Sequence, residues 1–445
     1  MSEKTGEAYK GNALKTITKA GAEIGDIIRV TKGNEILEGT LIPRSEYDSG
    51  SYIVIKQKNG YNVGIRLNEE VKIEKVGKGS KPTFISPPQP KQNRELPKVT
   101  ILSTGGTIAS RVDYRTGGVR PALTASDLYS IVPELGKIAQ IDAKILLSLF
   151  SENIIPSHWT EIAQTVEKEI SQGVDGVVIP HGTDTMGYTA AALSFALQNL
   201  PIPVVLVGAQ RSADRPSSDA ATNLIGAVMA AATAPFAEVT IAMHETPSDD
   251  SIIIHRGTKV RKCHTSRRDA FRSVNTAPIA RIKDQKLVML TKNFRKRDLR
   301  SRLTVKSTFE EKVALLKFYP SMDPKLIDWY VENHYVGLIL EGTGLGHVGR
   351  YCFDAIRHAT DNNLVVGMTS QCIWGRIDMN VYAPGRDLQA LGVVPMEDML
   401  PETALVKLMW ILGQTKDAKR ARNLLATNLV GELSPRTLSE KIGVE

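Results

Sequence analysis

The stretch VTILSTGGTIAS, residues 99–110, decides the fold class. Its first residues are apolar or β-branched, and the run ends in two threonines that flank Gly105 and Gly106. Three later segments repeat this pattern of a continuous apolar run that stops at a glycine or a polar residue: GVVIPHGT (176–183), PVVLVGAQ (203–210) and AEVTIAMHE (237–245). Helix-like patterns lie between them, as in 159–171 and 189–200. Continuous apolar strands that alternate with helices predict a mostly parallel sheet covered on both faces.

The two ends of the chain have different textures. Residues 26–76 contain several short alternating strands separated by turn residues, which predicts a small antiparallel barrel. Residues 77–96 are rich in Pro, Gly and Lys, as in an extended linker. The charged region 285–311 resembles a second linker, and the strand-then-polar pattern returns after it. We therefore expect a barrel and linker over 1–95, a large α/β domain over 96–300 and a smaller α/β domain over 301–445.

Composition excludes several classes of protein. The chain of 445 residues has no apolar run long enough to span a membrane, and its first residues lack the apolar core of a signal peptide, so we expect a cytoplasmic protein. Three scattered cysteines and eight histidines form neither a CxxC pair nor an HExxH motif, so we expect free thiols and no such zinc site. The net charge of +8 is concentrated in 256–268 and 291–306. Such segments either attract nucleic acid or form solvated faces. Aromatic residues are not interleaved with these cations for base stacking, so the sequence favours solvated faces.

Two strand-end loops carry hydroxyl groups. Neither GxxxxGK[ST] nor GxGxxG surrounds Gly105 and Gly106, so a phosphate-binding loop is excluded, although a simple tight turn would explain the glycines. The segment PHGTDTM (180–186) also places a threonine after a glycine, beside a carboxylate. Loops at the carboxyl ends of parallel strands converge, so the two hydroxyl groups can share one site. A threonine nucleophile needs activation, and a lysine within GTKVRKCHTS (257–266), its pKa lowered by burial and neighbouring cations, is our candidate.

The segments TILSTGGTIA (100–109) and GVVIPHGTDTM (176–186) resemble the two signatures of the L-asparaginase/glutaminase family. The resemblance covers roughly residues 97–445 and implies a two-domain α/β fold with a Rossmann-like large domain. It implies that Thr107 is the nucleophile and that Thr183, Asp184 and Lys262 form a second catalytic cluster. It further implies a set of substrate-binding residues: Ser151, Glu152, Gly106 and, on a mobile loop, Tyr114.

Two histidines lie in or near these motifs. His181 is inside the second signature, but the family uses threonine and lysine, so we interpret it as a turn or core histidine. His347, in EGTGLGHV, falls where relatives place a residue that reaches a neighbouring site.

The N-terminal barrel and linker set this chain apart from free-standing asparaginases. This arrangement is similar to one branch of the family, the D subunits of archaeal glutamyl-tRNA(Gln) amidotransferases. That resemblance implies a glutaminase that releases ammonia for a GatE-type partner, which would bind Glu-tRNA(Gln) and use ATP and Mg²⁺. It implies no cofactor or metal in this chain, and a homodimer within a heterotetramer. Two alternatives stay open: a stand-alone asparaginase, and a non-catalytic tRNA-binding scaffold.

Overall fold

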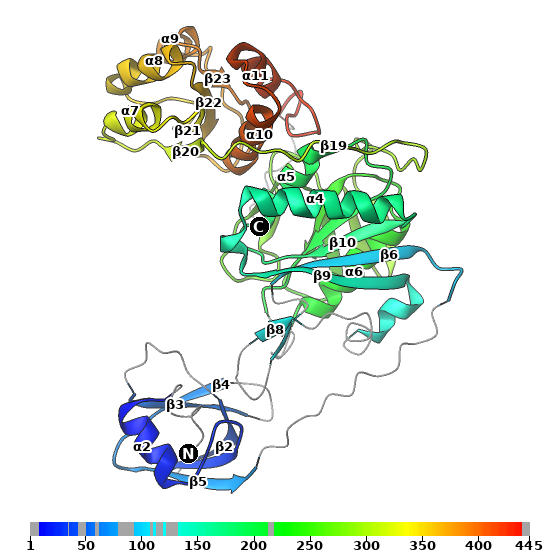
Figure 1. Cartoon of the computed structure of the whole chain (residues 1–445), viewed down its shortest axis with the longest axis vertical. Helices are drawn as coiled ribbons and strands as arrows, with labels where there is room; N and C mark the ends of the chain where they lie inside the picture. Colours follow the sequence, from blue (N-terminus) through cyan, green and yellow to red (C-terminus); the bar gives the residue numbers. More distant parts are fainter. Residues whose placement is uncertain are drawn as a thin grey trace.

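The computed structural model describes residues 9–33, 35–42, 50–57, 62–78, 93–106, 110–112, 119–121, 132–211 and 218–437. Figure 1 shows three parts in succession: a strand-rich N-terminal domain, a large α/β domain and a smaller C-terminal α/β domain. In the described parts of the chain, no helix is both long and apolar enough to cross a membrane. The prediction of free thiols is confirmed, because Cys263, Cys352 and Cys372 are all unpaired.

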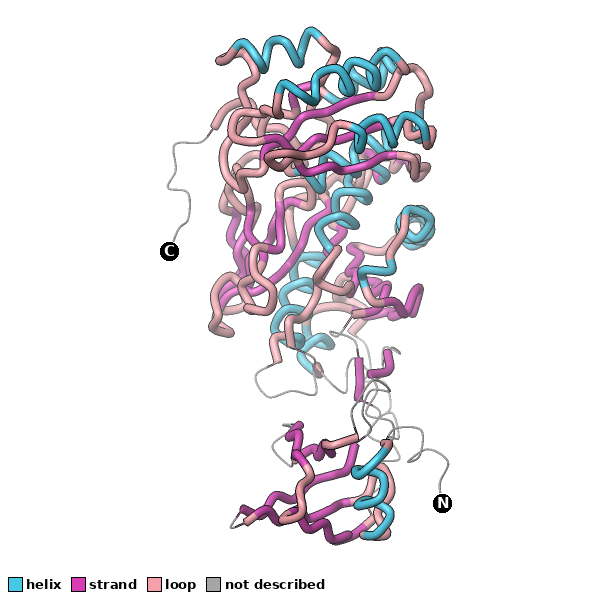
Figure 2. The backbone as a smooth tube through the Cα atoms, turned by 90° about the vertical axis from the view of Figure 1, so that its left-hand side faces the viewer, coloured by secondary structure: helices cyan, strands magenta, loops and turns pink. Residues whose placement is uncertain are grey.

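The N-terminal domain is an antiparallel sheet of five strands in the order β4-β3-β2-β1-β5. The strands are β1 (Ile27–Lys32), β2 (Glu35–Ile42), β3 (Tyr52–Lys56), β4 (Asn62–Arg66) and β5 (Val71–Gly77). Helix α2 (Gly11–Lys19), which the pattern did not predict, lies against this sheet and buries Ala13 and Ile17 (Figure 2). Buried alternate residues such as Ile53 and Ile55 complete this core.

The large domain is built on one eight-stranded sheet in the order β18-β17-β14-β13-β12-β10-β6-β9. The five strands from β9 to β13 are parallel, and β14, β17 and β18 extend the sheet as antiparallel strands. The strands are β6 (Lys98–Gly105), β9 (Gln140–Leu149), β10 (Gly176–Pro180), β12 (Val204–Val207), β13 (Val239–His244), β14 (Ser251–Arg256), β17 (Ala280–Lys283) and β18 (Lys286–Met289).

The expected linker at 285–311 is wrong in part. Residues 286–289 form edge strand β18, and β19 (Thr304–Val305) pairs with β11 (Leu197–Gln198). Only every second residue of β18 is even partly buried, and four residues are too few for such an alternation to stand out among flanking charges.

Helices cover both faces of the large sheet because both faces of its central strands are apolar. Val177 and Ile179 pack with α4 (Pro156–Ser171) and α5 (Met186–Ala196), whereas Val178 packs with α6 (Ala220–Thr233) on the other face. The remaining short elements of this domain are η1 (Pro133–Lys137), η2 (Ser151–Asn153) and two hairpins, β7 (Ser110–Val112) with β8 (Val119–Pro121) and β15 (Val260–Lys262) with β16 (Phe271–Ser273).

The C-terminal domain contains a parallel sheet in the order β20-β21-β22-β23. Its strands are β20 (Val313–Lys317), β21 (Gly337–Gly342), β22 (Val365–Ser370) and β23 (Val394–Pro395). Its helices are α7 (Lys325–Glu332), η3 (Arg350–Cys352), α8 (Phe353–Asp361), α9 (Ala383–Ala390), α10 (Pro401–Gln414) and α11 (Ala418–Leu425). Helices α10 and α11 share one core with the sheet, and α7 and α8 share another.

The two α/β domains are packed through α5 and α10, which lie side by side (Figure 1). The rings of Phe195 and Trp410 stack there with their centroids 5.8 Å apart. A buried ion pair crosses the same boundary, with Lys259 Nζ 2.7 Å from Asp398 Oδ2. The boundary is therefore an apolar interface that also contains a desolvated ion pair.

Candidate functional site

The candidate site lies where four neighbouring parallel strands end. Strands β9, β6, β10 and β12 are adjacent in the sheet, so the segments that follow them emerge at one edge. Such an edge is where parallel sheets place ligands and reactive groups. Their described parts are residues 150–153, Gly106, 181–185 and 208–211.

Glycines allow these segments to approach one another closely. Gly105 and Gly106 have positive φ angles of +118° and +79°. A Cβ atom at Gly105 would overlap the backbone of Leu149, and one at Gly106 would lie 2.7 Å from the amide nitrogen of Gly182. The hydroxyl of Thr104 donates to the carbonyl of Pro180 at 2.9 Å and holds the ends of β6 and β10 together. The glycine turn is therefore a close-contact element between two loops.

Thr183, Asp184 and Lys262 are brought together at this edge. Lys262 Nζ donates to Thr183 Oγ1 at 2.9 Å and to Asp184 Oδ1 at 2.8 Å. The Lys262 side chain is 14% exposed and that of Asp184 is 69% exposed, so the ammonium reaches the threonine from a shielded position. An ammonium only donates, so the Thr183 oxygen accepts this bond and its own hydrogen stays available. A positive charge beside the hydroxyl can stabilise an oxyanion formed there.

The β15–β16 hairpin and one ion pair define the setting of Lys262. The lysine ends β15 and pairs with Phe271 across that hairpin. The charged group that it contacts is the Asp184 carboxylate. Strand pairing therefore fixes the direction from which the ammonium approaches.

The two predicted substrate-binding residues of the 150–153 segment have different environments. Ser151 is buried, and its side chain packs against Gly182, where a Cβ atom would lie 2.8 Å from Ser151 Oγ. Its carbonyl accepts a hydrogen bond from Thr185 Oγ1 at 2.6 Å. Glu152 is exposed. Ser151 therefore lies within the loop cluster, and Glu152 lies at its surface.

The two side chains that hold the 208–211 loop in place, Asp219 and Asn223, were not predicted from the sequence. Asp219 accepts hydrogen bonds from the backbone N–H groups of Gln210 and Arg211 at 3.0 and 2.9 Å. Asn223 donates to the carbonyl of Gly208 at 2.9 Å, and a Cβ atom at Gly208 would lie 2.7 Å from Thr183 Cγ2. The two side chains therefore hold the loop on which the Thr183 methyl rests. The polar stretch SSDAATNL (217–224), which opens a helix, was the available signal.

His181 is a core histidine, as interpreted from the sequence. Its Nδ1 lies 2.7 Å from the carbonyl of Gly182, and its Nε2 lies 2.9 Å from Thr189 Oγ1, which also accepts from Trp159 Nε1. Burial lowers the pKa of His181 from 6.5 to about 4, against the opposing effect of the Gly182 carbonyl. The ring is therefore neutral near pH 7 and holds the loop that carries Thr183.

The stability of the fold should fall in acid because of this histidine. The pKa of His181 is lower in the folded state than its ordinary value, so below pH 6.5 the unfolded state binds the proton more readily. The stabilisation is complete above about pH 6.5 and is lost as the pH falls toward 4, by about 3 kcal/mol in total at about 1.4 kcal/mol per pH unit. The free energy of unfolding, measured with urea at pH 4.5 and pH 7.5, should differ less between the two pH values in His181→Asn than in the native protein. Equal differences in both proteins would contradict this account.

Two predicted site residues, Thr107 and Tyr114, lie outside the described residues. His347 is described, and both of its ring nitrogens are buried without a hydrogen-bond partner among the described residues. Its ring lies 5.7 Å from that of Tyr382, and its role at a neighbouring site stays a prediction. Among the residues described, no group of three or more His, Cys, Asp or Glu side chains is arranged to hold a metal ion.

The fold and the site define a class of protein. The family model "Asparaginase, N-terminal" matches residues 98–295, and "Glutaminase/Asparaginase C-terminal domain" matches residues 312–425. Among solved structures, the thermostable L-asparaginase from Thermococcus kodakarensis is 32% identical with a TM-score of 0.69, covering 76% of this chain and 100% of its own. L-asparaginase I from Vibrio cholerae is 26% identical with a TM-score of 0.66, covering 76% and 99%. The chain has the two-domain α/β fold of asparaginase-type amidohydrolases.

The N-terminal domain narrows the identification. The family model "GatD N-terminal domain" matches residues 22–76. The glutamyl-tRNA(Gln) amidotransferase D subunit of Pyrococcus furiosus is 51% identical over 427 residues, which is 95% of this chain and 97% of that protein. The protein of the same name from Methanopyrus kandleri is 49% identical over 438 residues, with 96% and 94% covered. The chain belongs to the family of glutamyl-tRNA(Gln) amidotransferase D subunits.

Proposed function

We propose that this chain hydrolyses the side-chain amide of glutamine and supplies the ammonia with which an amidotransferase converts Glu-tRNA(Gln) to Gln-tRNA(Gln). The contact of Lys262 with Thr183 and Asp184, at the strand ends beside the Gly105–Gly106 turn, carries the chemical part of the proposal. Full-length relatives named as amidotransferase D subunits support the assignment to tRNA-dependent amidation over a stand-alone asparaginase or a non-catalytic scaffold.

The first half of the reaction forms an ester. Thr107, which follows Gly106 directly in the chain, attacks the amide carbon of the substrate. Its hydroxyl proton passes to the departing nitrogen, which leaves as ammonia. Backbone N–H groups of the glycine turn stabilise the tetrahedral oxyanion between these steps.

The second half hydrolyses the ester. Thr183 and Lys262 orient and activate a water molecule, whose oxygen attacks the acyl carbon while its proton returns to the Thr107 oxygen. Asp184 balances the charge of Lys262 between turnovers, which keeps the ammonium at its 2.9 Å contact with Thr183. Neither half requires a metal or an organic cofactor in this chain.

The substrate is held by its α-amino and α-carboxylate groups. Ser151 and Gly106 bind the carboxylate side, Glu152 offers a carboxylate to the ammonium group, and Tyr114 closes over the bound amino acid. Ser151 is suited to this role because it packs within the loop cluster next to Gly182. Both glutamine and asparagine carry these two groups, so the length of the side chain decides between them.

The partner is a GatE-type subunit. A homodimer of this chain with two such partners forms a heterotetramer in the cytoplasm, where Glu-tRNA(Gln) is available. The partner binds most of the tRNA and uses ATP and Mg²⁺ to activate the glutamyl carboxyl group.

Ammonia release from glutamine and from asparagine tests the proposal. We expect glutamine hydrolysis to rise sharply when a GatE-type subunit and Glu-tRNA(Gln) are added. Rapid hydrolysis of asparagine by the chain alone, without stimulation by the partner, would instead identify an asparaginase with an added domain. Salt-sensitive tRNA binding without any hydrolysis would identify a scaffold.

Gly106→Ala should impair hydrolysis without unfolding the protein. A Cβ atom at Gly106 would push the turn away from Gly182, and a displacement of about 1 Å in a catalytic group costs roughly 10²-fold in rate. Gly173→Ala is a matched control, because Gly173 has a φ of +80° but nothing within 4 Å of the added atom. Ammonia release and thermal unfolding should be measured for both. Equal activity in the two variants would show that the close contact has no catalytic role.

A further inference from the structure

The two basic segments of the chain differ in the structure in a way that their sequences do not reveal. In 256–268, and at Arg272 shortly after it, every lysine and arginine has a carboxylate partner. Arg256 pairs with Glu238, Arg261 with Glu402, and Arg268 with Asp249. Arg267 and Arg272 both pair with Asp269. This segment is therefore largely neutralised within the fold.

The segment 291–306 keeps its positive charge. Arg297 is bound internally to Asp175 and Arg300 to Asp298, whereas no ion pair is found for Lys292, Arg295, Lys296 or Arg302 among the described residues. All four are exposed. These four cations, within positions 292–302, create a local field that attracts anions.

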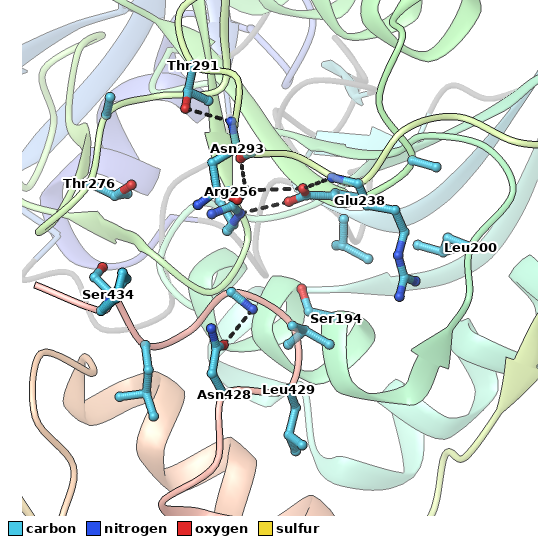
Figure 3. A pocket seen from close by; sticks show the side chains of 18 of the residues that line it. Ser194, Leu200, Glu238, Arg256, Thr276, Thr291, Asn293, Asn428, Leu429 and Ser434 are labelled. Atoms are coloured by element: carbon cyan, nitrogen blue, oxygen red, sulfur yellow. Dashed lines mark hydrogen bonds and ion pairs between the residues drawn. The ribbon is translucent and has the colours of Figure 1, made fainter.

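A cavity of about 450 Å³ opens beside this segment. It lies near the start of β13 and the end of β14, at the sheet edge opposite to the catalytic loops. The end of α5, the loop 291–295 and the C-terminal segment 428–436 form its other walls (Figure 3). Its volume falls in the range of about 300–1,000 Å³ that is typical of small-molecule sites.

The ion pair of Arg256 with Glu238 lines this cavity, as Figure 3 shows. Arg256 donates to both oxygens of Glu238, at 2.8 and 3.1 Å, and to the carbonyl of Asn293 at 2.6 Å. Glu238 also accepts from the backbone N–H of Arg295 at 2.7 Å. Among the described residues of the lining, Glu238 is the one acidic residue, and both of its oxygens already accept hydrogen bonds.

Two further arginines line the cavity from segments far apart in the sequence. Arg295 ends the loop 291–295, and Arg436 ends the C-terminal segment 428–436. Both are exposed, and neither guanidinium group has a hydrogen-bond or ion-pair partner among the described residues. Three arginines against one glutamate leave two positive charges. The side-chain amide groups of Asn293 and Asn428 supply further uncharged donors at the lining.

We propose that this cavity binds a phosphate group, with Arg295 and Arg436 as its charged ligands. Guanidinium groups present paired N–H donors that match two phosphate oxygens, and amide donors complete such a site. The phosphate belongs to an RNA strand that continues along Lys292 and Lys296, or to a free nucleotide. The site is distinct from the glutaminase centre and does not depend on its chemistry.

The test compares Arg295→Ala/Arg436→Ala with Arg357→Ala/Arg420→Ala in the full chain. Arg357 and Arg420 are exposed helix residues without an ion pair in the described structure, so the control loses the same charge elsewhere. The first probe is a fluorescein-labelled single-stranded 12-nucleotide RNA, followed by anisotropy at several KCl concentrations. Loss of the one neutralised phosphate should lower the salt slope by about 0.7 and weaken binding roughly fivefold at 0.1 M salt. The control should bind RNA like the native chain.

The second probe separates the two sources of phosphate. Thermal unfolding is measured with AMP, inorganic phosphate and L-glutamate. If AMP or phosphate stabilises the native chain and the control but not Arg295→Ala/Arg436→Ala, the site binds a free phosphate compound. If that variant loses only RNA affinity, the site binds RNA. Equal RNA binding by both double variants, with no loss of phosphate stabilisation, would overturn the proposal. A stabilisation by L-glutamate that equals the one by phosphate, and that only Arg295→Ala/Arg436→Ala loses, would also overturn it, because the cavity would then bind carboxylates as well as phosphates. Glutamine hydrolysis is measured in parallel and should be the same in all three proteins, so a failure of the glutaminase assignment would be seen separately.

Discussion

Thr183→Val is expected to lower kcat/KM for glutamine by roughly 10³-fold. This is the typical effect of removing a side chain that takes part in general acid–base catalysis. Valine keeps the methyl group that rests on Gly208 and removes the oxygen that Lys262 contacts. Thr183→Ser makes the opposite change, since it keeps the hydroxyl and removes the methyl. We expect the serine variant to stay within about tenfold of the native activity. Ammonia release measured in both variants checks the prediction.

Lys262→Met should reduce the activity to a similar extent, because the ammonium and the hydroxyl act as one unit. Effects of residues that act together are not additive, so the double variant with Thr183→Val should be little worse than either single change. Lys283→Met is the control for loss of a lysine, since Lys283 lies on β17 in an exposed pair with Asp250. Native activity in Lys262→Met, or fully additive losses in the double variant, would contradict the proposed coupling.

Glu432→Ala is expected to lower the free energy of unfolding by about 3–5 kcal/mol, because it would leave a buried ammonium without its counter-charge. Lys407 Nζ lies 2.7 Å from Glu432 Oε1, and both side chains are fully buried. Burial lowers the pKa of Lys407 and Glu432 opposes that effect, so the pair is stable only as a unit. Glu432 also accepts from the N–H groups of Leu429 and Val430, which would lose their partner.

Urea unfolding followed by tryptophan fluorescence measures this loss, since Trp410 lies one turn from Lys407 on α10. Glu310→Ala is the matched control. It removes a carboxylate that pairs with Lys416, whose side chain is 74% exposed, and exposed pairs contribute about 0–1 kcal/mol. Lys407→Met/Glu432→Leu should recover much of the stability, because two apolar groups leave no unpaired charge. Equal losses in Glu432→Ala and Glu310→Ala would show that the buried pair adds nothing.

Several features of the site follow from local sequence. The glycines at 105 and 106 and the threonines beside them stand directly after an apolar run, so their place at a strand end could be predicted from order alone. The same holds for Thr183 and Asp184 after β10. His181 was interpreted correctly as a core residue, although its neutral state comes from burial and its position from contacts with Thr189 and Gly182.

The class of fold, the alternation of strands and helices and the strand ends where reactive groups gather could all be predicted from the sequence, because these features depend on the periodicity of neighbouring residues. The tertiary structure decided which groups meet. Lys262 reaches Thr183 across 79 positions because a hairpin carries it there, and Asp219 and Asn223 support the loop beneath Thr183. It also decided which cations are neutralised: Arg256 and Arg261 meet carboxylates from distant segments, whereas Arg295 and Arg436 meet none among the residues that the structure describes. Pairing across long separations depends on how packed elements bring residues into contact, and no local pattern records it.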